Sequence, residues 1–125
     1  MSIEDYEVGD VIHCFNPKIG KNKFHICVCV SKDYFIVINT ENRRFFECVE
    51  LEARDYKFLN GINRFVECAE IFHHDIQIII SGQKKGKILE KDLKNIVNKI
   101  QKSARIPEYQ KKIVIPELLK KIKKH

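Results

Sequence analysis

Hydrophobic residues in the first two thirds of the chain fall into short runs that turn residues separate. Apolar and β-branched runs of about four to eight residues, bounded by Gly, Pro, Asn or Asp, are typical of β-strands. Such runs occupy residues 10–15, 24–30, 34–39, 45–51, 64–69 and 75–80. Only a short turn separates the second run from the third, which favours a hairpin. The pattern therefore predicts an antiparallel sheet that curls into a small barrel.

The hydrophobic period changes after residue 82. Apolar residues then recur at helical spacing, which predicts an amphipathic helix with its lysines toward solvent: Ile88, Leu89, Leu93, Ile96, Val97 and Ile100. Pro107 makes continuation of that helix past Arg105 unfavourable, and Pro116 suits the first position of a short basic helix over residues 116–125. We predict a mainly β (α+β) chain, with a small antiparallel barrel over 1–82 and a basic helical extension over 83–125 that form one domain.

Length and composition place the chain among ordinary globular domains. Its 125 residues, 44% hydrophobic and 32% charged, suit one domain. No apolar run approaches the ~18 residues of a membrane span, and the acidic start lacks an apolar leader. The five cysteines are an odd number, which disfavours a secreted disulfide framework and predicts a reducing, cytoplasmic location. Cys27 and Cys29 share one face of a predicted strand, where buried, inert thiols are favoured over a metal pair.

Charge divides the chain into two parts of opposite sign. Residues 1–80 hold nine Lys and Arg against thirteen Asp and Glu, a balance of −4. Residues 81–125 hold fourteen Lys and Arg against four Asp and Glu, a balance of +10. This asymmetry indicates an anionic partner, either nucleic acid or an acidic protein. A solvated, lysine-rich helix face is the alternative interpretation.

Several short segments resemble the MazF/PemK-like toxin superfamily of small SH3-like barrels. Residues 8–11 (VGDV) look like the opening of its first strand, and residues 24–31 (FHICVCVS) look like its second strand. Residues 36–40 (IVINT) and 63–69 (NRFVECA) are similar to its third strand and a later one. Residues 103–107 (SARIP) match a Ser-x-x-Ile-Pro step that follows a helix in one branch of the family. Each motif is short and degenerate, but together they cover most of the chain.

The resemblance implies a metal-independent endoribonuclease that cleaves single-stranded RNA and belongs to a toxin–antitoxin system. It also implies a homodimer and an acidic antitoxin as protein partner. In well-studied members of the family, an arginine on the second strand and a Thr or Ser at the end of the third form the active centre. His25 and Thr40 hold these two places here. The histidine departs from the usual arginine, which bears on the chemistry rather than on the fold.

The same residues fit RNA cleavage on chemical grounds. A base must take the proton of the 2′-hydroxyl, and donors must neutralise the phosphate in the transition state. His25 can exchange a proton near neutral pH, and the Thr40 hydroxyl can donate to a phosphate oxygen. We therefore expect His25 and Thr40 to be catalytic. Basic side chains are the expected substrate-binding residues: Arg43, Arg44, Arg64 and His13.

Some of the histidines have a structural interpretation that requires neither catalysis nor metal binding. His25 lies among apolar residues, where a hydrogen-bonded core histidine is as common as a catalytic one. His73 and His74 would point to opposite faces of a strand, which disfavours a shared metal ion. No nucleotide-binding or zinc-protease motif is present, so we expect neither a metal nor a cofactor.

Three classes of function follow from these patterns. The first is the toxin-like endoribonuclease. The second is a catalytically inactive barrel that binds nucleic acid through its basic part, with affinity that falls steeply with salt. The third is a module that binds a protein partner, such as an acidic antitoxin.

Overall fold

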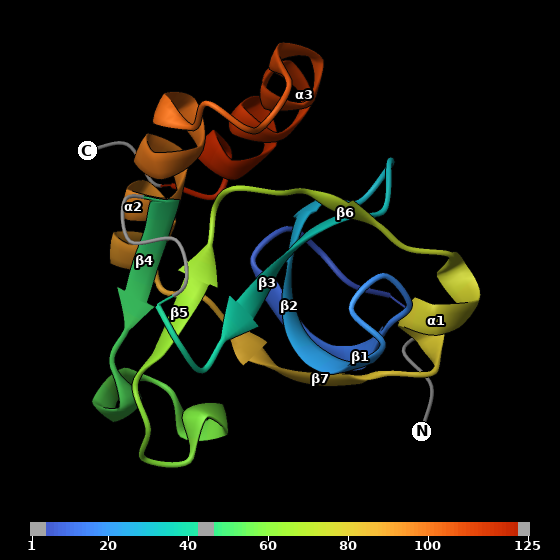
Figure 1. Ribbon diagram of the computed structural model, residues 1–125, viewed down its shortest axis with the longest axis vertical. Coiled ribbons are helices and arrows are strands. Elements are labelled where there is room, and N and C mark those ends of the chain that lie inside the picture. The colour runs from blue at the N-terminus through green and yellow to red at the C-terminus, as the bar shows by residue number, and fades with distance from the viewer. Residues whose placement is uncertain (1–4, 43–46, 123–125) are drawn as a thin grey trace.

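A curled antiparallel sheet forms the body of the protein, and two helices follow it (Figure 1). A computed structural model describes residues 5–42 and 47–122. Along the sheet the strand order is β4–β5–β3–β2–β1–β7, and the short β6 also pairs with β3. The strands are β1 (Asp10–Asn16), β2 (Lys21–Cys29), β3 (Tyr34–Asn39), β4 (Cys48–Leu51), β5 (Arg64–Glu67), β6 (Phe72–His73) and β7 (Gln83–Lys87). The predicted class, an α+β chain with a curled antiparallel sheet and C-terminal helices, is confirmed.

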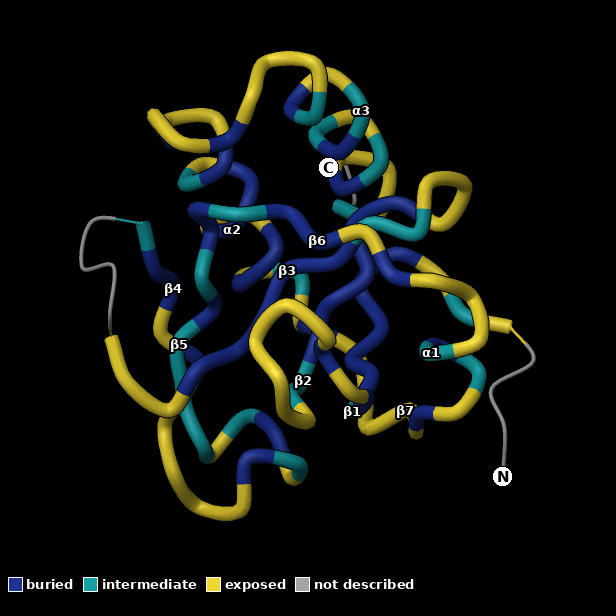
Figure 2. The backbone as a smooth tube through the Cα atoms, turned by 45° about the vertical axis from the view of Figure 1, so that its right-hand side comes forward, coloured by how far each residue is buried: buried dark blue, intermediate teal, exposed yellow. Residues whose placement is uncertain are grey.

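The central strands owe their positions to buried apolar residues. β2 and β3 form the predicted hairpin, in which Phe24 pairs with Ile38 and His25 pairs with Val37. Most of β1, β2 and β3 is buried, whereas β7 and the turns are exposed (Figure 2). Since side chains alternate along a strand, residues that pair across strands share one face of the sheet. The register of β1 and β2 therefore shows on which face of the sheet each polar side chain lies: His13, which pairs with Phe24, is on one face and His25, which pairs with Ile12, is on the other.

The C-terminal helices cover one end of the sheet, beside β4 and β5 (Figure 1). α2 (Glu90–Lys102) contacts β4, and α3 (Glu108–Leu119) contacts both α2 and β2. The predicted helix is confirmed by α2, and four residues of its apolar stripe are buried as expected: Leu93, Ile96, Val97 and Ile100. Ile88 and Leu89 were also expected in this stripe, but both precede α2, and Leu89 is exposed. Pro107 stands at the N-cap of α3, after α2 has ended at Lys102. No helix within the described ranges has the length and apolar character that crossing a membrane requires.

Three local predictions are wrong. Residues 75–80 were expected as a strand, but Ile76–Ile80 form the short helix α1 because the Asp75 side chain accepts a hydrogen bond from the Gln77 N–H at 2.9 Å. The sheet continues past residue 82, since β7 pairs with β1 through its main chain. The last helix begins at Glu108, so Pro116 lies inside α3 rather than at the start of a helix.

The turn from α1 into β7 approaches β1 closely at Gly82. A Cβ atom there would lie 2.8 Å from both the Cβ of Cys14 and the carbonyl oxygen of His13. Such separations are too short for non-bonded carbon and oxygen atoms, so a side chain at Gly82 would push β7 off β1. Glycine therefore allows the exposed lysine-rich segment to join the sheet. Two short 3₁₀ turns, Ala53–Asp55 and Lys57–Leu59, connect β4 to β5.

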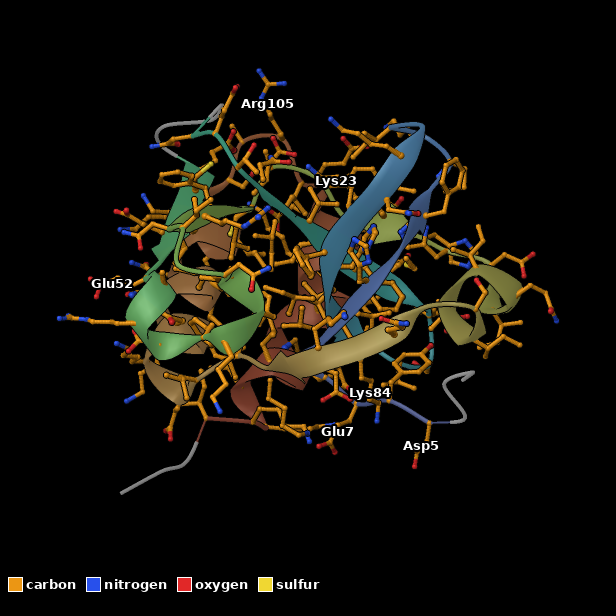
Figure 3. The ribbon with its side chains drawn as sticks, turned by 90° about the horizontal axis from the view of Figure 1, so that it is seen from below. Asp5, Glu7, Lys23, Glu52, Lys84 and Arg105 are labelled. Atoms are coloured by element: carbon orange, nitrogen blue, oxygen red, sulfur yellow. The ribbon has the colours of Figure 1, made fainter. Side chains whose placement is uncertain are left out.

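The acidic and basic parts of the chain face each other in the folded molecule. Asp5, Glu7 and Lys84 gather along the β7 edge of the molecule (Figure 3). Lys121 of the C-terminal end lies 3.0 Å from the Glu7 carboxylate, and Lys87 of β7 bonds to the same carboxylate. Further pairs of this kind are Lys87–Asp10 at 3.0 Å, Lys91–Asp55 at 2.7 Å and Arg105–Glu47 at 3.5 Å. Part of the predicted charge asymmetry is thus compensated within the chain.

Candidate nucleic-acid interface

A pair of rings from neighbouring strands forms the centre of the candidate interface. His13 of β1 pairs with Phe24 of β2, and their ring centroids are 4.8 Å apart. Both side chains are half-buried, so part of each is within reach of solvent. Phe58, on the turn before β5, flanks Phe24 with ring centroids 5.2 Å apart. The register places the His13–Phe24 pair on the same sheet face as Ile38 and Val66.

Arg64, at the start of β5, adds a cation to this pair. Its guanidinium carbon lies 5.5 Å from the centroid of Phe24, which is the geometry of a cation–π contact. The Nε of Arg64 is buried and has no hydrogen-bond partner among the described residues. A buried donor without a partner costs about 1–3 kcal/mol, so this guanidinium is suited to an incoming acceptor.

Lys85 supplies a second positive charge next to His13. The register between β1 and β7 shifts between Val11 and Ile12, and Lys85 is the exposed residue of this irregularity. Burial lowers the pKa of His13 below its usual range, and the charges of Lys85 and Arg64 lower it further. The ring of His13 is therefore neutral at pH 7 and can accept a proton or a hydrogen bond.

An exposed aromatic ring extends the same face toward the end of β1. Phe15 follows His13 by two residues, so it points to the same side of the sheet, and 47% of its surface is exposed. Thr40 is exposed just past the end of β3, and Asn39 before it pairs with Phe65, the neighbour of Arg64. We call the group of His13, Phe15, Phe24, Arg64 and Lys85 the aromatic–basic face.

His25 lies on the other face of the sheet and has no exposed surface. Its Nδ1 is 3.5 Å from the Cys14 Sγ, and its Nε2 is 3.2 Å from the Asn16 side-chain nitrogen. Burial, and then the nearby ring of His74, lower the pKa of His25 to about 3. The ring is therefore neutral and enclosed in this structure, which matches the core-histidine interpretation.

The structure separates some predicted site residues and brings others together. Val37, the partner of His25, is three residues before Thr40, a distance of about 10 Å along a strand, and His25 and Thr40 do not meet. His13 and Arg64 share one face with Phe24 between them. Arg43 and Arg44 lie outside the described residues.

The sequence did not identify Phe15, Phe24 and Lys85 as site residues. Phe24 belongs to an apolar run that resembles any buried strand, and only the register shows that it stands beside His13 and under Arg64. Lys85 lies in a lysine-rich segment that was assigned to the helical extension. The polar run Lys21-Asn22-Lys23 directly before Phe24 was an available signal, because it marks the solvated end of a strand.

Comparison with known proteins adds no assignment: no model of a protein family matches the chain, and no curated protein matches its sequence.

Proposed function

We propose that the protein binds single-stranded RNA on its aromatic–basic face. The observation that carries the proposal is the stack of Arg64 on Phe24 beside His13, with the Arg64 Nε buried and unpaired among the described residues. An RNA phosphate is an acceptor that suits this guanidinium, and it carries the charge that Lys85 and Arg64 attract.

The aromatic rings favour a single strand over a duplex. Proteins that bind single-stranded RNA combine cations that follow the phosphates with exposed rings on which unpaired bases stack. Phe15 is exposed, and Phe24 and His13 are half-exposed, all on one face of β1 and β2. Bases inside a duplex are already stacked on each other, so such rings add little to its binding.

The helical extension is a weaker candidate for the same role. Lys91 and Arg105 each face a carboxylate of the barrel part, and Lys121 faces Glu7. A phosphate would have to displace these carboxylates. The cations of the aromatic–basic face contact a ring or solvent instead, so their charge is more readily offered to RNA.

Fluorescence anisotropy with a labelled, unstructured RNA of mixed sequence tests the proposal. Phe24→Leu keeps an apolar side chain and removes the ring, so we expect about tenfold weaker binding, from a stacking loss of ~1–3 kcal/mol. Arg64→Gln should weaken binding and reduce the salt slope of log K by about one. Lys94→Gln, on the exposed side of α2, is the matched control and should bind as the wild type does. Equal binding by all four proteins, or no binding by the wild type, would overturn the proposal.

RNA cleavage at this face is the second candidate function. The observation that favours it is His13, whose lowered pKa leaves it neutral and able to take the 2′-hydroxyl proton. In this proposal His13, and not the enclosed His25, is the general base, while Arg64 and Lys85 hold the phosphate. The 2′-oxygen attacks the phosphorus to form a 2′,3′-cyclic phosphate, the bond from phosphorus to the 5′-oxygen breaks, and that oxygen leaves with a proton from water. Incubation of long RNA with the protein in EDTA should give cleavage that His13→Asn abolishes although RNA still binds. Cleavage that persists in His13→Asn, or is absent from the wild type, would leave binding as the sole function of the face.

A further inference from the structure

Three potential metal ligands converge on the face of the sheet opposite to the aromatic–basic face. Cys14 comes from β1, His25 from β2 and His74 from the segment that follows β6. All three residues are buried, and their ligand atoms lie within 4.8 Å of one another. Distant parts of the sequence thus bring one sulfur and two imidazoles to a single point.

We propose that Cys14, His25 and His74 form a binding site for a zinc ion. One cysteine and two histidines match the mixture of thiolate and imidazole ligands that Zn²⁺ takes in proteins. Calcium and magnesium prefer oxygen ligands, and this cluster supplies none. The sequence predicts no metal site, because His73 and His74 would point to opposite faces of a strand; the structure combines His74 with two residues of the sheet instead.

The spacing of the atoms suits a tetrahedral ion. Bond lengths of about 2.3 Å to sulfur and about 2.0 Å to nitrogen place tetrahedral S and N ligands about 3.5 Å apart. The Sγ of Cys14 and the Nδ1 of His25 are 3.5 Å apart. The rings of His25 and His74 meet edge to face, with centroids 4.6 Å apart. All three ligand atoms lie within 4.8 Å of one another, so a small rotation of side chains would close the site on an ion.

A second observation also indicates an ion at this place. The Nε2 of His74 is buried without a hydrogen-bond partner among the described residues, and the residue is only 3% exposed. A buried polar atom without a partner costs about 1–3 kcal/mol. Coordination to a metal would satisfy this nitrogen and remove that cost.

An open hollow gives the ion a path to the site. It has a volume of about 280 Å³ and is lined by Asn16 and His74 together with Phe72 and residues near them. Asn16 also contacts His25, so the hollow reaches the edge of the cluster. A water from this side would complete four ligands around the ion, as in zinc sites with three protein ligands.

Asn16 controls how well His25 can serve as a ligand. Coordination through Nδ1 moves the ring proton to Nε2, which then needs an acceptor, and the Cys14 thiol releases its proton to solvent. Asn16 presents its nitrogen to Nε2, while its oxygen accepts a hydrogen bond from the Ile19 N–H at 3.0 Å. Asn16→Asp would offer one oxygen to each donor. We therefore expect Asn16→Asp to bind zinc about tenfold more tightly.

Cobalt provides a visible probe of the site. We would titrate the metal-free full-length protein with Co²⁺ and then displace it with Zn²⁺, recording absorption and stoichiometry. One ion per chain and a thiolate-to-cobalt charge-transfer band are expected. Cys14→Ser should abolish the band, and His74→Asn should weaken Zn²⁺ binding at least about tenfold. His73→Asn and Cys48→Ser are matched controls outside the cluster and should bind as the wild type does.

Three results would overturn the proposal: no 1:1 binding, a band that survives Cys14→Ser, or equal losses in His73→Asn and His74→Asn. A thermal measurement keeps the test decisive if Cys14→Ser fails to fold. Zn²⁺ should raise the Tm of the wild type and of Asn16→Asp, and the same Zn²⁺ concentration should raise the Tm of His74→Asn clearly less. Zinc binding is independent of RNA binding, since the two sites lie on opposite faces of the sheet.

Discussion

The two faces of the β1–β2 ribbon place histidines of the same chain in contrasting environments. On one face, His13 stands half-exposed beside an aromatic ring and two cations. On the other, His25 is fully buried between a thiol and a side-chain amide. The strands that carry them are adjacent, and His13 pairs with Phe24, the residue just before His25. A shift of one residue along a strand therefore moves a side chain from a partly exposed face to the buried core.

This contrast shows that environment, rather than residue type, decides the role of each histidine. Both pKa values are lowered, but the causes differ: burial and the adjacent His74 act on His25, whereas positive side chains add to burial at His13. An enclosed neutral imidazole suits coordination or packing. A neutral imidazole that solvent can reach suits proton transfer or contact with RNA.

The largest expected effect comes from removing the enclosed ring. His25→Ala would leave a cavity and an unpaired Asn16 amide in the core, so we expect a loss of about 3 kcal/mol in the free energy of unfolding. His13→Ala should cost less than about 1 kcal/mol, because its ring is partly solvated already. Urea denaturation of both variants measures the difference. Losses of equal size would contradict the contrast between the two faces.

The second largest expected effect is a loss in the free energy of unfolding at acid pH. His25 has a pKa of about 3 in the folded protein and about 6.5 in an unfolded chain, so the unfolded state takes up its proton first as the pH falls. Its stabilising contribution is complete above about pH 6.5 and is lost progressively toward pH 3. Between pH 7 and pH 5 this one group should cost about 2 kcal/mol.

Denaturation of the metal-free protein in EDTA at a series of pH values measures this loss. His25→Gln should flatten the profile, and His73→Asn, at an exposed neighbouring position, should leave it unchanged. A profile that is equally steep in His25→Gln would show that another group carries the acid sensitivity.

The smallest expected effect concerns the exposed face. Lys85→Gln removes a charge that lowers the pKa of His13, so that pKa should rise toward its usual range. NMR titration of the His13 ring resonances measures the shift, and Lys94→Gln on α2 should produce none. The same variant should reduce the salt slope of RNA binding by about one. A His13 pKa that does not move would mean that Lys85 lies too far away to act on bound phosphate.

Much of the fold could be predicted because periodicity depends on local sequence. The hairpin of β2 and β3 and the stripe of α2 follow directly from their apolar patterns. The same kind of pattern gave a wrong prediction at residues 76–80. Their four isoleucines favour a strand, but the side chain of Asp75 caps a helical turn there. β7 gave no apolar signal, since its residues are exposed and it joins β1 through main-chain pairing and charged side chains such as Lys87, which lies 3.0 Å from Asp10.

The candidate site was harder to predict because it depends on register and on distant contacts. Arg64 and His13 were identified from sequence as basic residues, but Phe24, which joins them, was not. His25 satisfied the resemblance to a family motif, yet the face on which a strand residue lies cannot be assigned before its partners are known. The convergence of His74 with Cys14 joins segments sixty residues apart, and no local pattern records it.

Because the cysteines are buried, the rate at which each thiol is alkylated reports how often the structure around it opens. All five cysteines are buried and form no disulfide, so an alkylating reagent, which is much larger than a metal ion, can reach them only when the surrounding structure opens. Cys14 lies near α1 and the turn at Gly82, whereas Cys48 lies in β4, which contacts α2. Mass spectrometry of partly alkylated protein would therefore measure the alkylation rate of Cys14 and of Cys48, and so the opening of each end of the sheet separately. The order in which the thiols react would show which end of the molecule yields first.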